Sequence, residues 1–225
     1  MMELTGKTLV VTGANGVLGH AVAARALALG ASVIGLDLHF EGPIDPRVRT
    51  AQVDLTDMAA TERCFAALGD LDILCNVAGG FAMGDTAYEI ASPQWDAMFK
   101  INVATTQNAI HAAMPIFLAR GRGSVVNIGA MSAREGQANM SAYCAAKSVV
   151  MRLTESLSKE LRAKGINVNA VLPSIIDTPR NRADMPDADF SRWVSPDDLA
   201  NVICFLGSDA AAAIHGALVP VVGLS

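Results

Sequence analysis

The sequence predicts one α/β domain, residues 1–225, with a doubly wound parallel sheet of about seven strands. Short apolar runs rich in β-branched residues alternate with helix-prone stretches along the whole chain. The composition agrees, because 52% of the residues are hydrophobic and only 17% are charged, as expected for strands buried on both faces. No long linker, composition break or repeat divides the chain, so a single domain is expected.

The expected elements follow in alternating order. The first strand leads into a helix that ends before Gly30, a residue suited to the end of a helix. Ser195, followed by Pro196 and two acidic residues, favours the start of another helix. Strands are expected at residues 8–11, 33–36, 51–53, 71–75, 124–128, 166–171 and 217–221. Helices are expected at residues 17–29, 57–68, 93–119, from about 143 to 164, and after Ser195.

Two segments interrupt this alternation, residues 79–91 and residues 175–194. Each follows the carboxyl end of an expected strand, and open α/β sheets bind their ligands at that edge. The second segment mixes charged, apolar and turn-forming residues, so we predict a mobile substrate loop at about residues 175–194. A purely structural crossover is the alternative interpretation.

The charge and the cysteine pattern exclude several classes of function. A net charge of −5 argues against nucleic acid or an anionic membrane surface as a partner. The chain has no apolar run as long as a membrane span and no leader-like start, so a cytoplasmic location is expected. The four cysteines and four histidines lack metal-ligand spacing, so no metal site is predicted and the cysteines are expected to be buried packing residues.

A glycine-rich segment, Thr12–Gly19, directly follows the first expected strand and opens the first expected helix. Glycine lets the backbone turn sharply and approach a pyrophosphate, while the helix N-terminus supplies free N–H groups and a partial positive charge. This placement predicts a dinucleotide-binding domain of the Rossmann type. The residues expected to contact the cofactor here are Gly13, Asn15, Gly16, Val17, Leu18 and Gly19.

Asp37, at the end of the second expected strand, predicts the preferred cofactor. A carboxylate at this point can accept hydrogen bonds from both hydroxyls of the adenosine ribose and would repel a 2′-phosphate. Because Asn15, Val17 and Leu38 supply no cation for such a phosphate, NAD(H) is expected in preference to NADP(H). A solvated loop aspartate is the alternative. Further contacts are expected at Asp54 and Leu55 near the adenine, and at Asn76, Ala78 and Gly79 beside the ribose.

Tyr143 and Lys147 form a candidate catalytic pair. They lie four residues apart, so on a helix their side chains share one face. A cation close to a phenol favours the phenolate and lowers its pKa, which would let Tyr143 exchange a proton near neutral pH. The alternative is a packing tyrosine beside a solvated lysine.

The ordered set of motifs resembles the short-chain dehydrogenase/reductase family over essentially the whole chain. The matching residues are Thr12–Gly19, Asp54, Asn76–Gly79, Asn102, Tyr143 with Lys147, and Pro173–Pro179. The resemblance implies hydride transfer between a nicotinamide and a bound substrate, with Tyr143 as general acid/base. It also implies that Lys147 lowers the pKa of Tyr143 and binds the nicotinamide ribose, and that Asn102 holds a water that relays protons to Lys147.

The same resemblance places Pro173, Ile176 and Thr178 in the segment that meets the nicotinamide, with the last two at the carboxamide. Two departures are mild. The middle glycine of the family pattern lies one position later, where this chain has Val17 after Gly16, and Ser174 stands where a glycine is usual. Backbone groups bind a pyrophosphate, so binding is still expected.

The third departure concerns the substrate. The family usually has a substrate-orienting serine thirteen residues before the tyrosine, and this position is Ala130. Ser132 is the nearest hydroxyl and could reach the site if the loop bulges, whereas Ser141 is expected to cap a helix. The dihydropteridine reductases are similar in this respect, because they have a Gly-Ala run here, keep the tyrosine and lysine, prefer NADH and reduce a quinonoid ring.

These observations predict an NAD(H)-dependent oxidoreductase acting on a small carbonyl, alcohol or quinonoid-ring substrate. The alternatives are a ketone reductase that uses Ser132, an enzyme like the dihydropteridine reductases without the usual serine, and a non-catalytic NAD(H)-binding sensor. A small-molecule substrate is expected, with neither nucleic acid nor a membrane as partner. The family resemblance also implies a homodimer or homotetramer formed through the long helices.

Overall fold

A parallel sheet of seven strands runs through the part of the chain that the computed structural model describes, residues 3–225. The strands lie in the order β3-β2-β1-β4-β5-β6-β7, and each pairs in parallel with its neighbours. This arrangement confirms the predicted fold class. The strands are β1 (Thr8–Thr12), β2 (Ser32–Asp37), β3 (Val48–Gln52), β4 (Ile73–Asn76), β5 (Gly123–Ile128), β6 (Ile166–Pro173) and β7 (Leu218–Val221).

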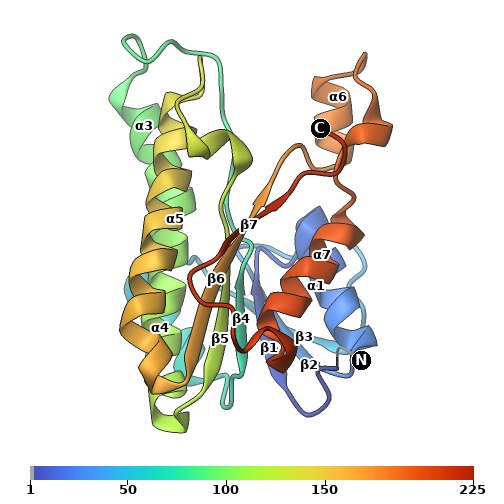
Figure 1. Ribbon diagram of the computed structural model, residues 1–225, viewed down its shortest axis with the longest axis vertical. Helices are drawn as coiled ribbons and strands as arrows, with labels where there is room; N and C mark the ends of the chain where they lie inside the picture. The colour runs from blue at the N-terminus through green and yellow to red at the C-terminus, as the bar shows by residue number, and fades with distance from the viewer. Residues whose placement is uncertain (1–2) are drawn as a thin grey trace.

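Helices cover both faces of this sheet (Figure 1). One face is covered by α1 (Val17–Ala28) and α7 (Pro196–Gly207). The opposite face is covered by α2 (Met58–Ala66), α4 (Thr105–Arg120) and α5 (Ser141–Leu161). Two shorter helices, α3 (Ser92–Phe99) and α6 (Pro179–Asp184), rise above the carboxyl ends of the strands (Figure 1).

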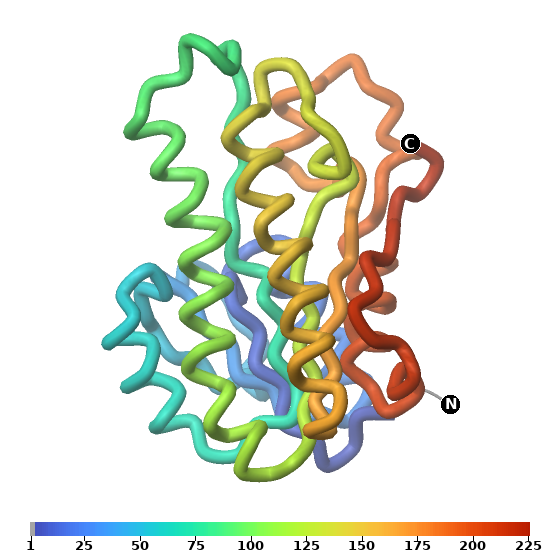
Figure 2. The backbone as a smooth tube through the Cα atoms, turned by 60° about the vertical axis from the view of Figure 1, so that its left-hand side comes forward, coloured from blue at the N-terminus to red at the C-terminus, as the bar shows by residue number. Residues whose placement is uncertain are grey.

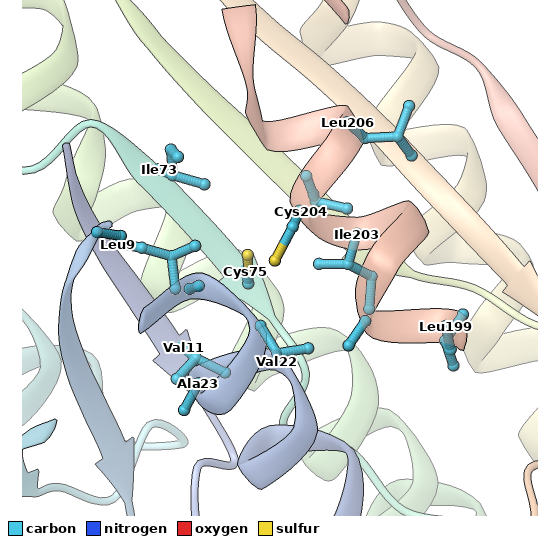
Figure 3. Close-up of a cluster of buried hydrophobic side chains, with 14 of the residues drawn as sticks. Leu9, Val11, Val22, Ala23, Ile73, Cys75, Leu199, Ile203, Cys204 and Leu206 are labelled. Atoms are coloured by element: carbon cyan, nitrogen blue, oxygen red, sulfur yellow. The ribbon is translucent and has the colours of Figure 1, made fainter. Parts of the chain in front are cut away.

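The core beneath α1 and α7 is apolar throughout its depth. Figure 3 shows Leu9 of β1 and Cys75 of β4 facing Cys204 of α7, with the two thiols directed toward each other. All the cysteines are free thiols; three are buried and Cys64 is partly buried, as expected for packing residues. Such close packing leaves the sheet a rigid platform for the loops at its edge.

The predicted third strand begins three residues too late and ends one residue too late. It was expected at residues 51–53, whereas β3 spans Val48–Gln52. β3 is the edge strand of the sheet, and polar Arg49 and Thr50 are exposed on it. A search for apolar runs therefore misses its first half, because an edge strand does not need to be buried on both faces.

Helix ends follow the sequence signals with one exception. Asp57 and Ser195 cap α2 and α7 by accepting hydrogen bonds from Ala60 N (3.0 Å) and Asp198 N (3.0 Å). The prediction that Ser141 caps α5 was wrong, because Met140 holds that position and Ser141 is already helical. Its buried hydroxyl has no hydrogen-bond partner among residues 3–225.

The helix expected at residues 93–119 is interrupted at its centre. α3 passes through a π-helical turn, Lys100–Ala104, before α4 begins. Such turns insert one residue into the helical ladder and occur often at functional sites. Asn102 lies at the middle of this turn and is fully buried.

The loops after β4 and β5 rise together above the sheet (Figures 1 and 2). Gly84 N donates a hydrogen bond to Asn139 O (3.0 Å), which joins the two loops. Asn139 has a positive φ of 62°. Within residues 3–225, no helix combines the length and hydropathy that a membrane crossing requires.

At the amino ends of the strands, a buried carboxylate ties α4 to the sheet. Asp72 accepts hydrogen bonds from Thr8 N (2.9 Å) and Arg120 Nη2 (2.8 Å). We expect Asp72→Asn to lower the free energy of unfolding by about 2 kcal/mol in urea titrations, because a charge-assisted bond is lost from a buried pair. Arg122→Ala is the control, since Arg122 lies 3.6 Å from the same carboxylate but is 66% exposed. Equal losses in both variants would contradict this assignment.

Candidate active site

The glycine-rich loop after β1 packs directly on the loop after β4. Gly13 has a φ of +66°, and a Cβ there would lie 2.9 Å from the Ala78 backbone. Thr12 Oγ1 accepts a hydrogen bond from Ala78 N (3.0 Å), which fixes the two loops together. A Cβ at Gly19 would lie 2.1 Å from Gly13 O, so the loop also turns tightly against the first turn of α1.

This loop fits a pyrophosphate. α1 begins at Val17 with Gly16 as its N-cap residue, and no side chain caps the helix. Its first N–H groups and the positive end of the helix dipole are therefore available to an anion. Val17 is exposed at the first helical position, so the altered glycine spacing leaves the helix N-terminus accessible.

Asp37 stands at the end of β2 with both carboxylate oxygens engaged by the backbone. Oδ2 accepts a hydrogen bond from Asn15 N (2.8 Å) and Oδ1 accepts one from Leu38 N (2.7 Å). Each oxygen retains a lone pair, so the carboxylate is held in place and can still accept from hydroxyl groups. Glu41 N donates a hydrogen bond to Asn15 Oδ1 (3.4 Å), which joins the loop after β2 to the glycine-rich loop.

The residues predicted near the adenine have different roles. Asp54 Oδ1 accepts hydrogen bonds from Thr56 N (2.8 Å) and Thr56 Oγ1 (2.7 Å), and these bonds lower the pKa of Asp54. Asp54 remains exposed, so it can meet a ligand. Leu55 is buried in the core, and its carbonyl oxygen accepts from Asn108 Nδ2 (2.9 Å). Its side chain therefore packs in the core rather than lining a site.

Asn76 does not present its side chain beside the ribose position, contrary to expectation. Asn76 Nδ2 donates to Asn127 Oδ1 (2.9 Å), and Asn127 Nδ2 donates to Thr154 Oγ1 (2.9 Å). This buried chain of hydrogen bonds joins β4, β5 and α5. The close-approach backbone after β4 is therefore supplied by Ala78 and Gly79, while Asn76 holds the strand ends in register.

Gly79 brings Asn102 and Lys147 to one point. A Cβ on Gly79 would lie 2.8 Å from Asn102 Oδ1 and 3.3 Å from Lys147 Nζ. Lys147 is buried, and its Nζ donates to Ile128 O (2.9 Å) at the end of β5. Among the described residues the Lys147 ammonium has no other hydrogen-bond partner, so its remaining N–H donors are available to a ligand.

The side chain of Asn102 is fully engaged with the protein. Its Oδ1 accepts from Gly80 N (3.1 Å), while its Nδ2 donates to Gly80 O (3.0 Å) and Met98 O (3.1 Å). The backbone carbonyl of Asn102 accepts from Thr106 Oγ1 (2.9 Å). Both amide N–H groups of Asn102 are therefore used within the protein, and they hold Gly80 and Met98.

Burial governs the pKa values of Tyr143 and Lys147 in the chain alone. Burial raises the pKa of Tyr143 to about 12, and burial lowers the pKa of Lys147 to about 8. Desolvation disfavours the charged form of each group. That Lys147 lowers the pKa of Tyr143 stays a prediction.

Tyr143 faces an apolar wall. Ala130 is 3% exposed and belongs, with Ala133, to a small cluster against which Tyr143 and Met131 pack. Ser132 directs its backbone carbonyl to Cys144 Sγ (3.3 Å), and no hydrogen bond between described residues joins its hydroxyl to Tyr143. Whether the Ser132 hydroxyl meets a substrate stays a prediction.

The predicted substrate loop is folded over most of its length. It contains α6, which Thr178 begins by accepting from Asn181 N (3.2 Å). Ile176 and Val194 form a parallel bridge that closes the base of the loop. Pro173 is buried at the end of β6, so its side chain supports this base.

Two sets of side-chain contacts stabilise the fold of the loop. Arg182 forms a double hydrogen bond with Asp177 (2.6 and 2.7 Å), and its guanidinium lies 4.9 Å from the centre of the Phe190 ring. Phe190 in turn packs on the buried Trp193. In the part of the chain from residue 3 onward, no group of three or more potential ligands could hold a metal ion.

Comparison with known proteins identifies the family. The model of the short chain dehydrogenases matches residues 7–189, so the chain belongs to the short-chain dehydrogenase/reductase family. Sorbitol dehydrogenase of Cereibacter sphaeroides is 35% identical over 187 residues, covering 78% of this chain and 73% of that protein. L-xylulose reductase of Bos taurus is 29% identical over 239 residues, covering 99% of this chain and 97% of that protein.

Solved structures share the fold over nearly the whole chain. Carveol dehydrogenase from Mycobacterium avium in complex with NAD has a TM-score of 0.88 and 27% identity, covering 98% of each chain. A protein of Agrobacterium tumefaciens with bound NADP has a TM-score of 0.89 and 32% identity, covering 99% of this chain and 97% of that one. The family therefore includes structures with either nicotinamide cofactor.

One residue at the site was missed by the sequence analysis. The rings of Phe81 and Tyr143 meet edge to face, with centroids 4.9 Å apart and an interplanar angle of 83°. The only signal was that residues 79–91 follow a strand end, which does not single out Phe81. Contact between a loop residue and a helix residue this far apart depends on the tertiary fold.

The burial of Lys147 predicts a pH-dependent effect on stability. The pKa of Lys147 is lower in the folded protein than in the unfolded chain, so the unfolded state binds more protons between pH about 8 and 10.5. Burying the charged ammonium therefore destabilises the fold below pH about 8, and this destabilisation disappears as the pH rises from about 8 to 10.5. We expect Lys147→Met to raise the free energy of unfolding by about 2 kcal/mol at pH 7 and by much less at pH 10. Urea titrations at both pH values measure this, with exposed Lys159→Met as control. A gain that is independent of pH would contradict it.

Proposed function

We propose that this chain is an NAD(H)-dependent oxidoreductase in which Tyr143 is the general acid/base. The supporting observation is that Asn102 and Lys147 meet at Gly79, one residue from the close contact of Ala78 with Gly13. Tyr143 lies on α5 four residues before Lys147. The substrate we propose is a small compound with a carbonyl, alcohol or quinonoid-ring group. A bound nicotinamide would exchange the hydride with this substrate.

The protonation states fit proton donation by Tyr143. With a pKa of about 12 in the chain alone, Tyr143 is protonated at neutral pH and can donate its phenolic proton to a substrate oxygen or nitrogen. Lys147, with a pKa of about 8, is charged at neutral pH and would stabilise the phenolate left behind.

The polar groups at the cofactor position support a division of tasks. Lys147 would use its free N–H donors on the nicotinamide ribose, as the family resemblance implies, while its bond to Ile128 O fixes the ammonium. Ile176 and Thr178, at the base of the substrate loop, would meet the carboxamide. Asn102 would act through its carbonyl on a relay water and through its amide on Gly80.

The substrate class has two candidates. Several relatives carry the names of sugar or polyol enzymes, such as D-threitol dehydrogenase of Mycolicibacterium smegmatis, which is 31% identical over 96% of this chain and 91% of that protein. The apolar surroundings of Ala130 favour instead a substrate whose reacting atom needs one hydroxyl, as in the dihydropteridine reductases. We favour the second candidate, because Ala130 supplies no donor beside Tyr143.

Assembly through the long helices remains part of this proposal. Enzymes of this family commonly form oligomers, and α4 and α5 expose Leu118 and Val149. A homodimer or homotetramer that packs these helices together would cover both side chains.

Asp37 predicts tighter binding of NADH than of NADPH. Its carboxylate is fixed by Asn15 N and Leu38 N and carries a negative charge where a 2′-phosphate would lie. We expect fluorescence titration to give an affinity at least about tenfold higher for NADH, and Asp37→Ser to reduce that ratio toward one. Glu41→Gln is the matched charge control on the next loop and should leave the ratio unchanged. Equal affinities in the wild type would contradict the proposal.

Activity measurements separate the two substrate candidates. With NADH and simple ketones, we expect Ala130→Ser to raise kcat by about tenfold or more, because it supplies a missing donor, and Ser132→Ala to have no effect. Tyr143→Phe should lower turnover by about 10²–10⁴-fold while NADH binding is retained. A sharp loss of activity in Ser132→Ala would show that the Ser132 hydroxyl already acts as the donor to the substrate. Full activity in Tyr143→Phe would eliminate Tyr143 as the acid/base.

A further inference from the structure

Phe81 places an aromatic ring directly beside the proposed proton donor. Its ring meets the ring of Tyr143 edge to face at 4.9 Å, and 41% of Phe81 is exposed. Phe81 therefore contacts the ring of Tyr143 and also keeps exposed surface that a ligand beside Tyr143 can meet.

The position of Phe81 is fixed by the backbone that precedes it. Both polar backbone groups of Gly80 are held by one amide, because Gly80 N donates to Asn102 Oδ1 (3.1 Å) and Asn102 Nδ2 donates to Gly80 O (3.0 Å). A Cβ on Gly80 would lie 3.2 Å from Ile101 Cδ1, so the chain also passes close to the π turn. Three residues beyond Phe81, Gly84 is bonded to Asn139 O. A loop held at both ends presents its ring with little freedom to move away.

The wall on which Tyr143 packs is apolar. Ala130 and Ala133 are buried beneath the phenol, and Met131 packs on the same cluster. A polyol bound here would leave its additional hydroxyl groups against carbon, and each unpaired polar group opposes binding. A flat, apolar ring has no such hydroxyl groups to leave unpaired, and stacked or edge-to-face contact between aromatic rings is favourable.

We propose that Phe81 is a substrate-contacting residue that selects compounds whose reducible carbonyl or imine group is attached to a planar aromatic or quinonoid ring. This proposal rests on the proposed function, since it assigns the substrate class of the same site. Phe81 contacts the ring of the substrate, and Tyr143 donates its proton to the reacting oxygen or nitrogen. The Asn102 amide acts as a positioning group, because it holds Gly80 and so orients Phe81.

Binding of unreactive ligands tests this without relying on turnover. The probes are 2-naphthol and decahydro-2-naphthol, which share a skeleton and a hydroxyl group but differ in planarity. Their dissociation constants are measured by ligand-observed NMR on the full chain saturated with NADH. We expect 2-naphthol to bind the wild type at least about tenfold more tightly than decahydro-2-naphthol. Phe81→Ala should weaken 2-naphthol about tenfold and leave decahydro-2-naphthol unchanged.

Two further variants separate ring contact from simple loss of bulk. Phe81→Leu keeps an apolar side chain without a ring, so it should lose most of the preference for 2-naphthol, whereas Phe81→Tyr should keep it. Met83→Ala is the control, because Met83 is more exposed on the same loop and should leave both constants unchanged. Equal weakening of both ligands in Phe81→Ala, or none, would overturn the proposal.

The same experiment distinguishes this inference from the proposed function. If the chain binds no NADH, the proposed function is wrong, and the two ligands are then compared on the chain alone. If NADH binds and ketones are reduced but Phe81→Ala affects both ligands alike, only the selection by Phe81 is wrong.

Discussion

The close packing of backbone on backbone at the ends of β1 and β4 is the constraint on which the site depends. Thr12 Oγ1 accepts from Ala78 N, and Gly13 has no room for a side chain against Ala78. This contact sets where β4 leaves the sheet, and therefore where Gly79 passes between Asn102 and Lys147. A larger residue at either contact would displace the glycine-rich loop and the proposed catalytic groups together, since protein interiors are closely packed.

Burial is the main influence on the pKa values of the proposed catalytic pair, Tyr143 and Lys147. Lys147 loses most of its hydration and regains one hydrogen bond, from its ammonium to Ile128 O. The phenol of Tyr143 is similarly shielded, so burial shifts the pKa of each group toward its neutral form, although Lys147 is still charged at neutral pH. Polar ligand groups that engage the free donors of Lys147 would restore part of its solvation. Such a site is poised to change its protonation behaviour when it is filled, and sequence spacing alone could not reveal this.

The sequence predicted the sheet and most helices, because these depend on local patterns. Alternating apolar runs are sufficient to place β1 and β6, and a glycine-rich turn is sufficient to place the first helix. It failed where a residue's role depends on distant partners. Asn76 pairs with Asn127 across the sheet, Asn102 uses its amide on Gly80, and Phe81 meets Tyr143. The edge strand β3 was misplaced for a related reason, since its exposure follows from its position in the sheet.

The π turn at Lys100–Ala104 sets the angular phase between two halves of one long helix. An α-helix advances about 100° per residue, so one inserted residue rotates everything beyond it by that amount. α4 can therefore keep its apolar side on the sheet while α3 turns a different side toward the loops above it. Because Asn102 sits within the turn, its reach to Gly80 depends on residue count as well as residue identity. An insertion or deletion of one residue within this turn would therefore alter the site more than most substitutions there.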